Sequence, residues 1–401
     1  MSPVAASCAT APRVGLVLSG GGARAAYQVG VLKAIADILP EGCQNPFPII
    51  CGTSAGALNA AGLATHAGRL REGVDLLESV WGNFRTHQVY RTDWYGVLAT
   101  AAKWLATLAF GRLLHNAPVS LLDNAPLREL LTHHMELERV QEAIEDGRLH
   151  ALCITASGYT SGASVSFYQG AADIDSWKRA RRLGVRTAIT VEHLMASAAI
   201  PLLFQAVRLN REYFGDGALR QIAPISPALH LGAEKVLVIG VSGQQQDAVN
   251  YRNKPVGYPS IAQVISHIMN SSFIDGLEAD IERLTRVNRT ISLIPDEVRN
   301  QVQLRPVDVM VLSPPSEVLD AVAMKHAGQL PKSIRLFVRG SGATQKSGSG
   351  VLSYLLFEAE YCHDLMELGY NDSMGRREEL LRFLGVPDSA RSNVLEFKKA
   401  E

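Results

Sequence analysis

Residues 13–39 read RVGLVLSGGGARAAYQVGVLKAIADIL and combine three local patterns that decide the fold. Val14 to Leu18 are a short apolar run, which is typical of a buried strand. The glycines Gly20 to Gly22 follow, and after them apolar side chains recur at helical spacing over about four turns. A buried strand, a glycine loop and a helix in this order predict the first unit of a mainly parallel sheet.

Later stretches repeat the strand pattern, and helical stretches separate them. Further strands are expected over Phe47–Cys51 and around Ile154, Val238 and Val311. The pattern from Ala125 to Gly147 is helical instead. Strands that alternate with helices predict an α/β fold in which helices cover both faces of the sheet.

A glycine- and serine-rich segment, GSGATQKSGSG at residues 340–350, indicates a flexible connection near the end of the chain. We expect a sheet-containing domain over residues 12–312 and a C-terminal helical extension over residues 313–401. The amphipathic stretches 351–370 and 376–384 are interpreted as packing helices of this extension.

Composition excludes several classes of protein. The chain has 401 residues and equal numbers of Lys+Arg and Asp+Glu, 39 each, so it lacks the basic excess of a nucleic-acid binder. Its five cysteines are scattered and form no CxxC pair, which favours free thiols in a reducing compartment over a disulfide framework or a zinc site. The first residues show no signal peptide. We therefore expect a cytoplasmic protein without metal or cofactor.

No stretch offers the roughly 20 uninterrupted apolar residues that a spanning helix needs. The nearest candidate, Trp94–Leu114, is interrupted by Lys103 and Arg112 and has apolar residues at helical spacing. An amphipathic helix of this kind can lie on a membrane surface or pack in the core, and the sequence leaves both open. Peripheral membrane contact is therefore part of the expectation.

The glycine loop suits an anion, because its backbone N–H groups are uncovered and the positive end of a helix follows it. The anion can be a phosphate or the oxyanion of a tetrahedral acyl intermediate. Gly20, Gly22 and Ala25 also satisfy the G-x-G-x-x-G/A dinucleotide fingerprint. That fingerprint expects an acidic residue at the end of the next strand, and IICGTSAG at residues 49–56 has none, which disfavours a nucleotide.

Ser54 lies between Gly52 and Gly56, directly after the second predicted strand. Small neighbours let a serine hydroxyl project from a sharp strand-to-helix turn, as a nucleophile requires. A second polar candidate is Asp216, because FQAVRLNREYFGDG at residues 204–217 predicts a β-hairpin that turns at residues 210–212 and ends at this aspartate.

A Ser-His-Asp triad is the alternative to a Ser–Asp pair. In α/β-hydrolases the serine elbow follows several strands, and here it follows the second, which is too early for that fold. The histidines after Asp216, which are His230, His267, His326 and His363, lie in no context that favours catalysis. We therefore predict a dyad in which Asp216 takes the proton of Ser54.

Taken together, Gly20–Arg24, Gly52–Gly56 and Asp216–Ala218 resemble the patatin-like phospholipase family, in its longer bacterial form with a C-terminal extension. MASAAIPLLF at Met195–Phe204 resembles the block that precedes the aspartate hairpin in that family. The resemblance covers about Arg13–Val241, with the motifs in the family's order. It implies a three-layer α/β/α fold and a Ser–Asp dyad, without metal or histidine, that hydrolyses acyl esters of lipids.

The resemblance also implies roles for single residues. Ser54 and Asp216 are the expected catalytic pair, Gly20, Gly21, Gly22, Ala23 and Arg24 the expected oxyanion hole, and Gly52 and Gly56 the expected elbow. Two places depart from the family pattern, where Ala25 and Ala218 stand for glycines. Acyl transfer, thioester cleavage, or phosphate or nucleotide binding without covalent chemistry remain the alternatives, and the substrate is expected to be a lipid or another acyl ester.

Two basic features have more than one interpretation. Arg24 can support the loop, form a structural ion pair, or meet a phosphate head group. The stretch WKRARRLGVR at Trp177–Arg186 carries five basic residues, and we interpret it as a solvated helix face, with anionic lipid as the alternative.

Overall fold

The computed structural model describes residues 12–40, 43–91, 120–241, 261–271, 276–299, 301–302, 304–332, 335 and 349–386. The amphipathic stretch Trp94–Leu114 lies outside these residues, as do Cys8 and residues 340–348 of the glycine- and serine-rich segment. Within the described ranges, no helix has both the length and the hydropathy that crossing a bilayer requires.

The core of the fold is a ten-stranded sheet in the described part of the chain. Its main path runs β10-β9-β1-β2-β3-β4-β6-β5, and β8 pairs with both β3 and β7. The strands from β10 to β3 along this path are mutually parallel, and β4 and β8 join β3 in antiparallel fashion. The strands are β1 (Val14–Leu18), β2 (Ile49–Thr53), β3 (Ala151–Gly158), β4 (Ser164–Gly170), β5 (Lys178–Arg179), β6 (Arg182–Arg186), β7 (Val207–Leu209), β8 (Glu212–Asp216), β9 (Lys235–Ile239) and β10 (Asp308–Leu312).

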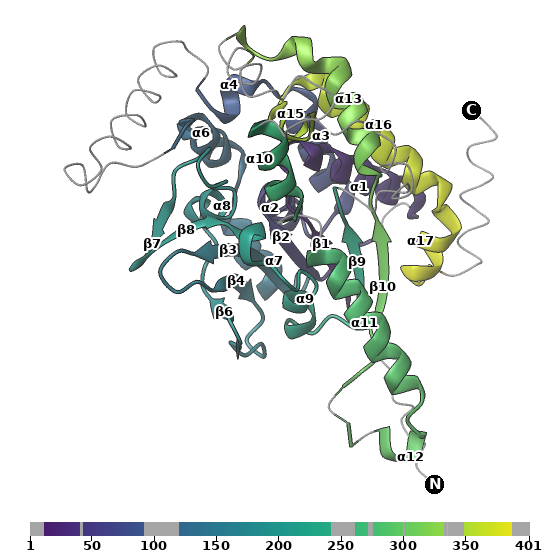
Figure 1. The fold of residues 1–401 in the computed structure, drawn as a ribbon. Helices are drawn as coiled ribbons and strands as arrows, with labels where there is room; N and C mark the ends of the chain where they lie inside the picture. The colour runs from purple at the N-terminus through teal and green to yellow at the C-terminus, as the bar shows by residue number, and fades with distance from the viewer. Residues whose placement is uncertain are drawn as a thin grey trace, which may run out of the picture.

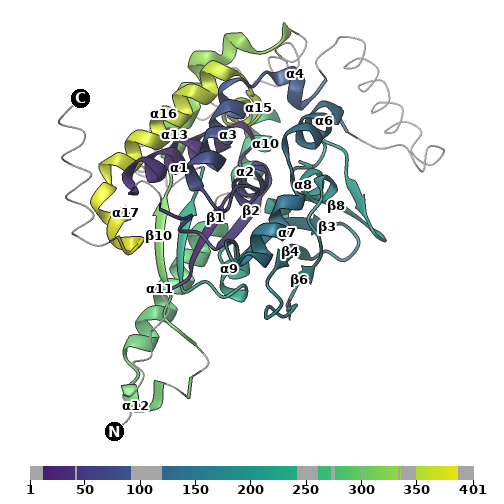
Figure 2. The ribbon, with the colours of Figure 1, turned by 180° about the vertical axis from the view of Figure 1, so that it is seen from behind.

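Helices cover both faces of this sheet, so the three-layer α/β/α expectation is confirmed (Figures 1 and 2). One face packs on α1 (Ala26–Ile38), α2 (Ala55–Ala64), α3 (Leu70–Gly82), α13 (Ser316–His326), α15 (Ser349–Leu355), α16 (Ala359–Gly375) and α17 (Arg377–Phe383). The other face packs on α9 (Ser226–His230) and α11 (Gly276–Ser292). Successive strand residues alternate between the two cores: Leu16 and Leu237 point to the first, Val17 and Val238 to the second.

The remaining helices surround this core. They are α4 (Thr86–Val89), α6 (Ala125–His134), α7 (Glu138–Glu145), α8 (Val191–Ser197), α10 (Ile261–Asn270) and α12 (Asp296–Arg299), with the short 3₁₀ helices η1 (Gly22–Ala25), η2 (Gly217–Arg220) and η5 (Ala327–Gln329).

Two predicted elements need correction. The second strand begins at Ile49 rather than Phe47, because Pro48 has no N–H to give to a strand ladder. Trp177–Arg186 is not a helix: β5 and β6 form an antiparallel pair there, and β6 continues the sheet beyond β4. The Trp177 ring stacks between those of Tyr168 and His230, which anchors this hairpin at the sheet.

The C-terminal helices pack directly on the sheet-bearing part of the chain. α16 runs alongside α1 (Figure 2). The Tyr27 hydroxyl donates a hydrogen bond of 2.9 Å from α1 to Asp372 in α16. Side chains of α15 and α16, including Leu352 and Leu365, are fully buried in the same cluster as β1 and α1. A domain boundary between residues 312 and 313 stays a prediction, and the two predicted parts share one hydrophobic core.

Candidate active site

The predicted serine elbow forms where β2 meets α2. β1 and β2 are parallel with Leu18 opposite Gly52, so the glycine loop and the serine turn lie at the same edge of the sheet. Ser54 has φ 55° and ψ −130°, a backbone conformation that is rare for a residue with a side chain and is typical of functional sites. A Cβ on Gly56 would lie 2.5 Å from the Ser19 carbonyl oxygen, so the turn closes only with glycine there.

Asp216 reaches Ser54 through the hairpin that the sequence predicts. β7 and β8 pair in antiparallel fashion, and β8 also pairs with β3, where Ala156 lies opposite Asp216. The Ser54 hydroxyl donates a hydrogen bond of 2.5 Å to Asp216 Oδ2, although 162 positions separate the two residues. Asp216 Oδ1 accepts the N–H of Ala218 at 2.9 Å, which fixes the orientation of the carboxylate.

Burial makes Asp216 a stronger base than an exposed aspartate. The residue is 0% exposed, and this loss of water raises the pKa of Asp216 to about 7. Hydrogen bonds from Ser54 and Ala218 lower the pKa and offset part of the effect of burial. A carboxylate of this kind is ionised in a large fraction near neutral pH and still accepts a proton readily.

The sequence analysis missed a third residue of the site, Ser197. Its hydroxyl accepts the N–H of Ser54 at 2.9 Å and donates to the Thr155 carbonyl at 2.6 Å. Two residues further on, the Ala199 carbonyl accepts the N–H of Asp216 at 2.8 Å. The segment Met195–Phe204 therefore holds both members of the pair. Its signal in the sequence was the family-like block, which by itself gave Ser197 no role.

The glycine loop presents donors beside the elbow. The N–H groups of Gly20, Gly21, Gly22 and Ala23 have no hydrogen-bond acceptor among the residues that the structure describes. The loop continues into η1 and then α1, so the positive end of a helix faces the same region. The close approach of Gly56 to Ser19 brings the loop and the elbow together. Unpaired amides beside a serine can bind an oxyanion.

The comparison with known proteins covers the stretch in which these motifs lie. Residues 16–229 match the family described as patatin-like phospholipase, and this range is more than half of the 401 residues. The chain belongs to the patatin-like phospholipase family.

Individual relatives match part of the chain. The cGAMP-activated phospholipase of Pseudomonas aeruginosa is 29% identical over 215 residues, which are 54% of this chain and 55% of that protein. Lysophospholipase nte1 of Aspergillus terreus is 45% identical over 74 residues, 17% of this chain and 4% of that protein. The chain thus spans about half the length of the first of these relatives and a small part of the second.

A solved structure is also similar in fold. Human GIVD cytosolic phospholipase A2, in complex with methyl gamma-linolenyl fluorophosphonate, has a TM-score of 0.42 and 13% identity. This similarity covers 96% of the present chain and 60% of the human chain.

Arg24, in the family's glycine motif, directs its side chain to the C-terminal helices. Its N–H donates to the Gly21 carbonyl at 3.2 Å, and its buried guanidinium bonds to Ser353, Tyr354 and Asp320. Of the roles that the sequence left open, these contacts favour support of the loop rather than a place in the predicted oxyanion hole or contact with a phosphate. Each of its side-chain nitrogens already has a protein partner.

The buried side-chain amides of Gln28 and Asn59 hold the glycine loop through hydrogen bonds. Gln28 Nε2 donates to the carbonyls of Ser19 and Ile239 at 2.8 and 3.1 Å, and Asn59 Nδ2 donates to Gln28 Oε1 at 2.9 Å and to the Ala25 carbonyl at 3.1 Å. These bonds join α2 to both ends of the loop. The sequence analysis missed this pair, whose signal is an amide at an otherwise apolar position of each helix.

The histidines do not complete a triad in the described part of the chain, where none hydrogen-bonds to Ser54 or Asp216. His230 stacks on Trp177, and burial lowers the pKa of His230 to about 4. His326 Nε2 lies 2.8 Å from Asp364, in the C-terminal helices. The hydroxyl of Ser54 therefore has one acidic partner among these residues, Asp216.

Proposed function

We propose that this protein is a serine acyl hydrolase that cleaves acyl esters of lipids, with Ser54 as nucleophile and Asp216 as general base. The observation that carries the proposal is the 2.5 Å hydrogen bond from the Ser54 hydroxyl to the buried Asp216 carboxylate. Membership of the patatin-like phospholipase family supports the substrate class. Both phospholipase relatives support it as well, over the parts that they match.

In the first half of the reaction Ser54 Oγ forms a bond to the ester carbonyl carbon while its proton moves to Asp216. The carbonyl oxygen becomes an oxyanion, which accepts hydrogen bonds from the N–H groups of Gly21, Gly22 and Ala23. Each such donor contributes about 3 kcal/mol in the transition state. The ester C–O bond then breaks, the leaving alcohol takes the proton from Asp216, and an acyl-Ser54 intermediate remains.

In the second half a water molecule attacks the acyl-Ser54 carbonyl and gives its proton to Asp216. The same amides stabilise the second oxyanion. The bond between Ser54 Oγ and the acyl carbon then breaks, and Oγ takes the proton back from Asp216. The fatty acid is released. A pKa near 7 suits both steps, because Asp216 must accept and return one proton in each half.

The surface around the site fits contact with lipid. Tyr159 and Tyr213 are 53% and 54% exposed, and Leu202 and Ile222 are both 60% exposed. The Tyr159 N–H donates to the Tyr213 carbonyl, and the Tyr159 ring lies against Gly215, the residue before Asp216. Exposed apolar side chains of this size mark interaction surfaces when they gather in one place. We propose that these four side chains form a rim that meets a lipid surface. We also propose that Arg211, exposed at the tip of the β7–β8 hairpin, faces lipid head groups.

Ser54 is only 2% exposed, so we infer that substrate entry needs movement of the residues around it. The name of the Pseudomonas aeruginosa relative makes cGAMP a ligand to test as an activator of this movement. Hydrolysis measured with and without cGAMP decides the point. A constant rate over the whole concentration range excludes this activator.

The test of the function is hydrolysis of p-nitrophenyl acyl esters and of phospholipid vesicles by the wild type and by Ser54→Ala and Asp216→Asn. We expect both variants to lose turnover while their unfolding transitions remain cooperative. Wild-type turnover in Ser54→Ala would remove the dyad from the mechanism. Analysis of products with an added alcohol or an acyl thioester separates hydrolysis from the acyltransferase and thioesterase alternatives. Tight nucleotide binding without turnover would favour a binding module.

A further inference from the structure

Arg24 is the largest fully buried side chain of the described residues and carries a charge. Its Nε donates to Ser353 Oγ at 2.8 Å and its Nη2 to Asp320 Oδ1 at 2.9 Å. The guanidinium also lies over the Tyr354 ring, 4.2 Å from the centroid, and Nη1 is 3.4 Å from the Tyr354 hydroxyl. The buried guanidinium of Arg24 is thus held by hydrogen bonds, an ion pair and an aromatic ring face together.

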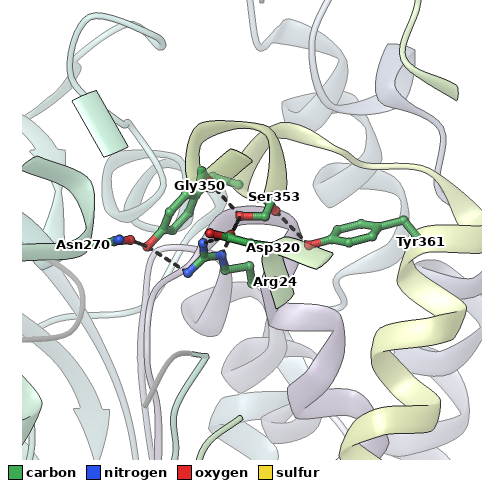
Figure 3. A network of polar contacts seen from close by, with 7 residues as sticks. Arg24, Asn270, Asp320, Gly350, Ser353 and Tyr361 are labelled. Atoms are coloured by element: carbon green, nitrogen blue, oxygen red, sulfur yellow. Dashed lines mark hydrogen bonds and ion pairs between the residues drawn. The ribbon is translucent and has the colours of Figure 1, made fainter. Parts of the chain in front are cut away.

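All these partners lie beyond residue 229, where the family match ends. Ser353 and Tyr354 come from α15, and Asp320 comes from α13. Ser353 is itself held by hydrogen bonds. Its Oγ donates to the Gly350 carbonyl at 2.7 Å, and the Tyr361 hydroxyl donates to the Ser353 carbonyl at 3.2 Å (Figure 3). Ser353, Tyr354 and Asp320 of the C-terminal helices therefore form a socket for the Arg24 guanidinium.

The socket also touches the glycine loop itself. Gly22 has φ 56°, and a Cβ there would clash with the Tyr354 carbonyl oxygen. Arg24 follows two residues later in η1, and its N–H closes the turn onto Gly21. The backbone of α15 thus packs on the loop at Gly22 while the Arg24 side chain anchors the loop in the same helix.

We propose that Ser353, Tyr354 and Asp320 are positioning residues for the oxyanion-binding loop, so that the C-terminal helices are part of the catalytic centre. The proposal rests on the proposed function, because it assigns the loop to the stabilisation of an oxyanion. Amide donors act only within about 2.7–3.1 Å of the oxyanion. A displacement of about 1 Å costs roughly 100-fold in rate.

The experiment compares Ser353→Ala and Asp320→Asn with a control, Tyr27→Phe. The control also removes a hydrogen bond between the N-terminal part and the C-terminal helices, that from Tyr27 to Asp372, but this bond joins α1 to α16 and involves neither Arg24 nor α15. For each variant we measure kcat and KM with p-nitrophenyl acyl esters, the thermal midpoint, and hydrogen exchange of the peptide that contains residues 19–25.

We expect kcat to fall about 10-fold in Ser353→Ala and up to about 100-fold in Asp320→Asn, with KM nearly unchanged. Exchange in the loop should rise in both, whereas Tyr27→Phe should change only the thermal midpoint. Arg24→Lys should also lower kcat, because lysine lacks the planar guanidinium that bonds to Ser353 and Asp320 together. If Asp320→Asn fails to fold, Ser353→Ala carries the same comparison.

Unchanged exchange and unchanged kcat in Ser353→Ala would overturn the positioning role. An equal fall in kcat in Tyr27→Phe, at an equal loss of stability, would also overturn it. Failure of the proposed function gives a different pattern, since Ser54→Ala would then retain wild-type turnover. The exchange measurement needs no substrate and tests the socket in either case.

Discussion

The hydroxyl of Ser197 joins the Ser54 N–H to the Thr155 carbonyl, with bonds of 2.9 and 2.6 Å. One buried side chain thus ties the serine elbow to β3, the strand that pairs with the aspartate hairpin. A strained backbone persists only when its surroundings hold it, and Ser197 supplies part of that support for Ser54.

Replacing Ser197 by alanine should therefore harm both stability and turnover. The change leaves a buried N–H and a buried carbonyl without their partner, which costs about 1–3 kcal/mol for such a group. Urea unfolding measures the loss, and steady-state kinetics should show a lower kcat. Ser373→Ala is the matched control, because the hydroxyl of this fully buried serine donates within α16, to the Gly369 carbonyl. Equal kcat in both variants would contradict a role for Ser197 at the elbow.

The activity should depend on pH through Asp216. The base works only when ionised, and burial raises the pKa of Asp216 to about 7. We expect kcat/KM to rise as the pH increases through about 7 and to level off above it. A profile measured from pH 5 to 9 tests this. A rising limb near pH 4 would mean that Asp216 titrates like an exposed carboxylate.

Stability should change with pH in the opposite direction. The pKa of Asp216 is about 7 in the folded state and about 3.9 in an unfolded chain, so between these values the folded state binds more protons. The contribution of Asp216 to the free energy of unfolding therefore falls as the pH rises from about 4 to about 7. Urea unfolding at pH 5 and pH 8 measures it as the difference between wild type and Asp216→Asn. An equal pH dependence in both proteins would refute the raised pKa.

The elbow should tolerate no side chain at Gly56. A Cβ there would meet the carbonyl oxygens of Leu18 and Ser19, which are backbone atoms that cannot move aside cheaply. Gly56→Ala should lower the free energy of unfolding by about 1–3 kcal/mol or more and abolish turnover. Gly375→Ala is the control, because an added Cβ there would meet no atom of another described segment within 4 Å. Wild-type activity in Gly56→Ala would contradict the geometry of the turn.

Much of the fold could be predicted because parallel strands leave a strong local signal. β1, β3, β9 and β10 each contain a run of apolar residues, and the β7–β8 hairpin has its own turn signal. The interpretation of Trp177–Arg186 as a helix was wrong, because its strand conformation depends on pairing with β4 and on the stacking of Trp177. Neither contact is visible in local composition.

The candidate site, like the fold, could be predicted only in part from the sequence. Motif order predicted the partnership of Ser54 and Asp216, and the structure places them in contact, while their catalytic roles stay predictions. The partners of Arg24 are 296 to 330 positions away and lie beyond the family match, so no local pattern relates them to the loop. Ser197 was hidden for a similar reason, since its two bonds reach residues 143 and 42 positions away.

The central claim is that Asp216 activates Ser54 as a nucleophile, and the rate of labelling by an alkyl fluorophosphonate tests it most directly. Peptide mapping by mass spectrometry should find the adduct on Ser54 in the wild type. The rate should fall about 100-fold or more in Asp216→Asn, and no adduct should form at this peptide in Ser54→Ala. Equal labelling rates in the wild type and Asp216→Asn, or an adduct on another residue alone, would contradict the account.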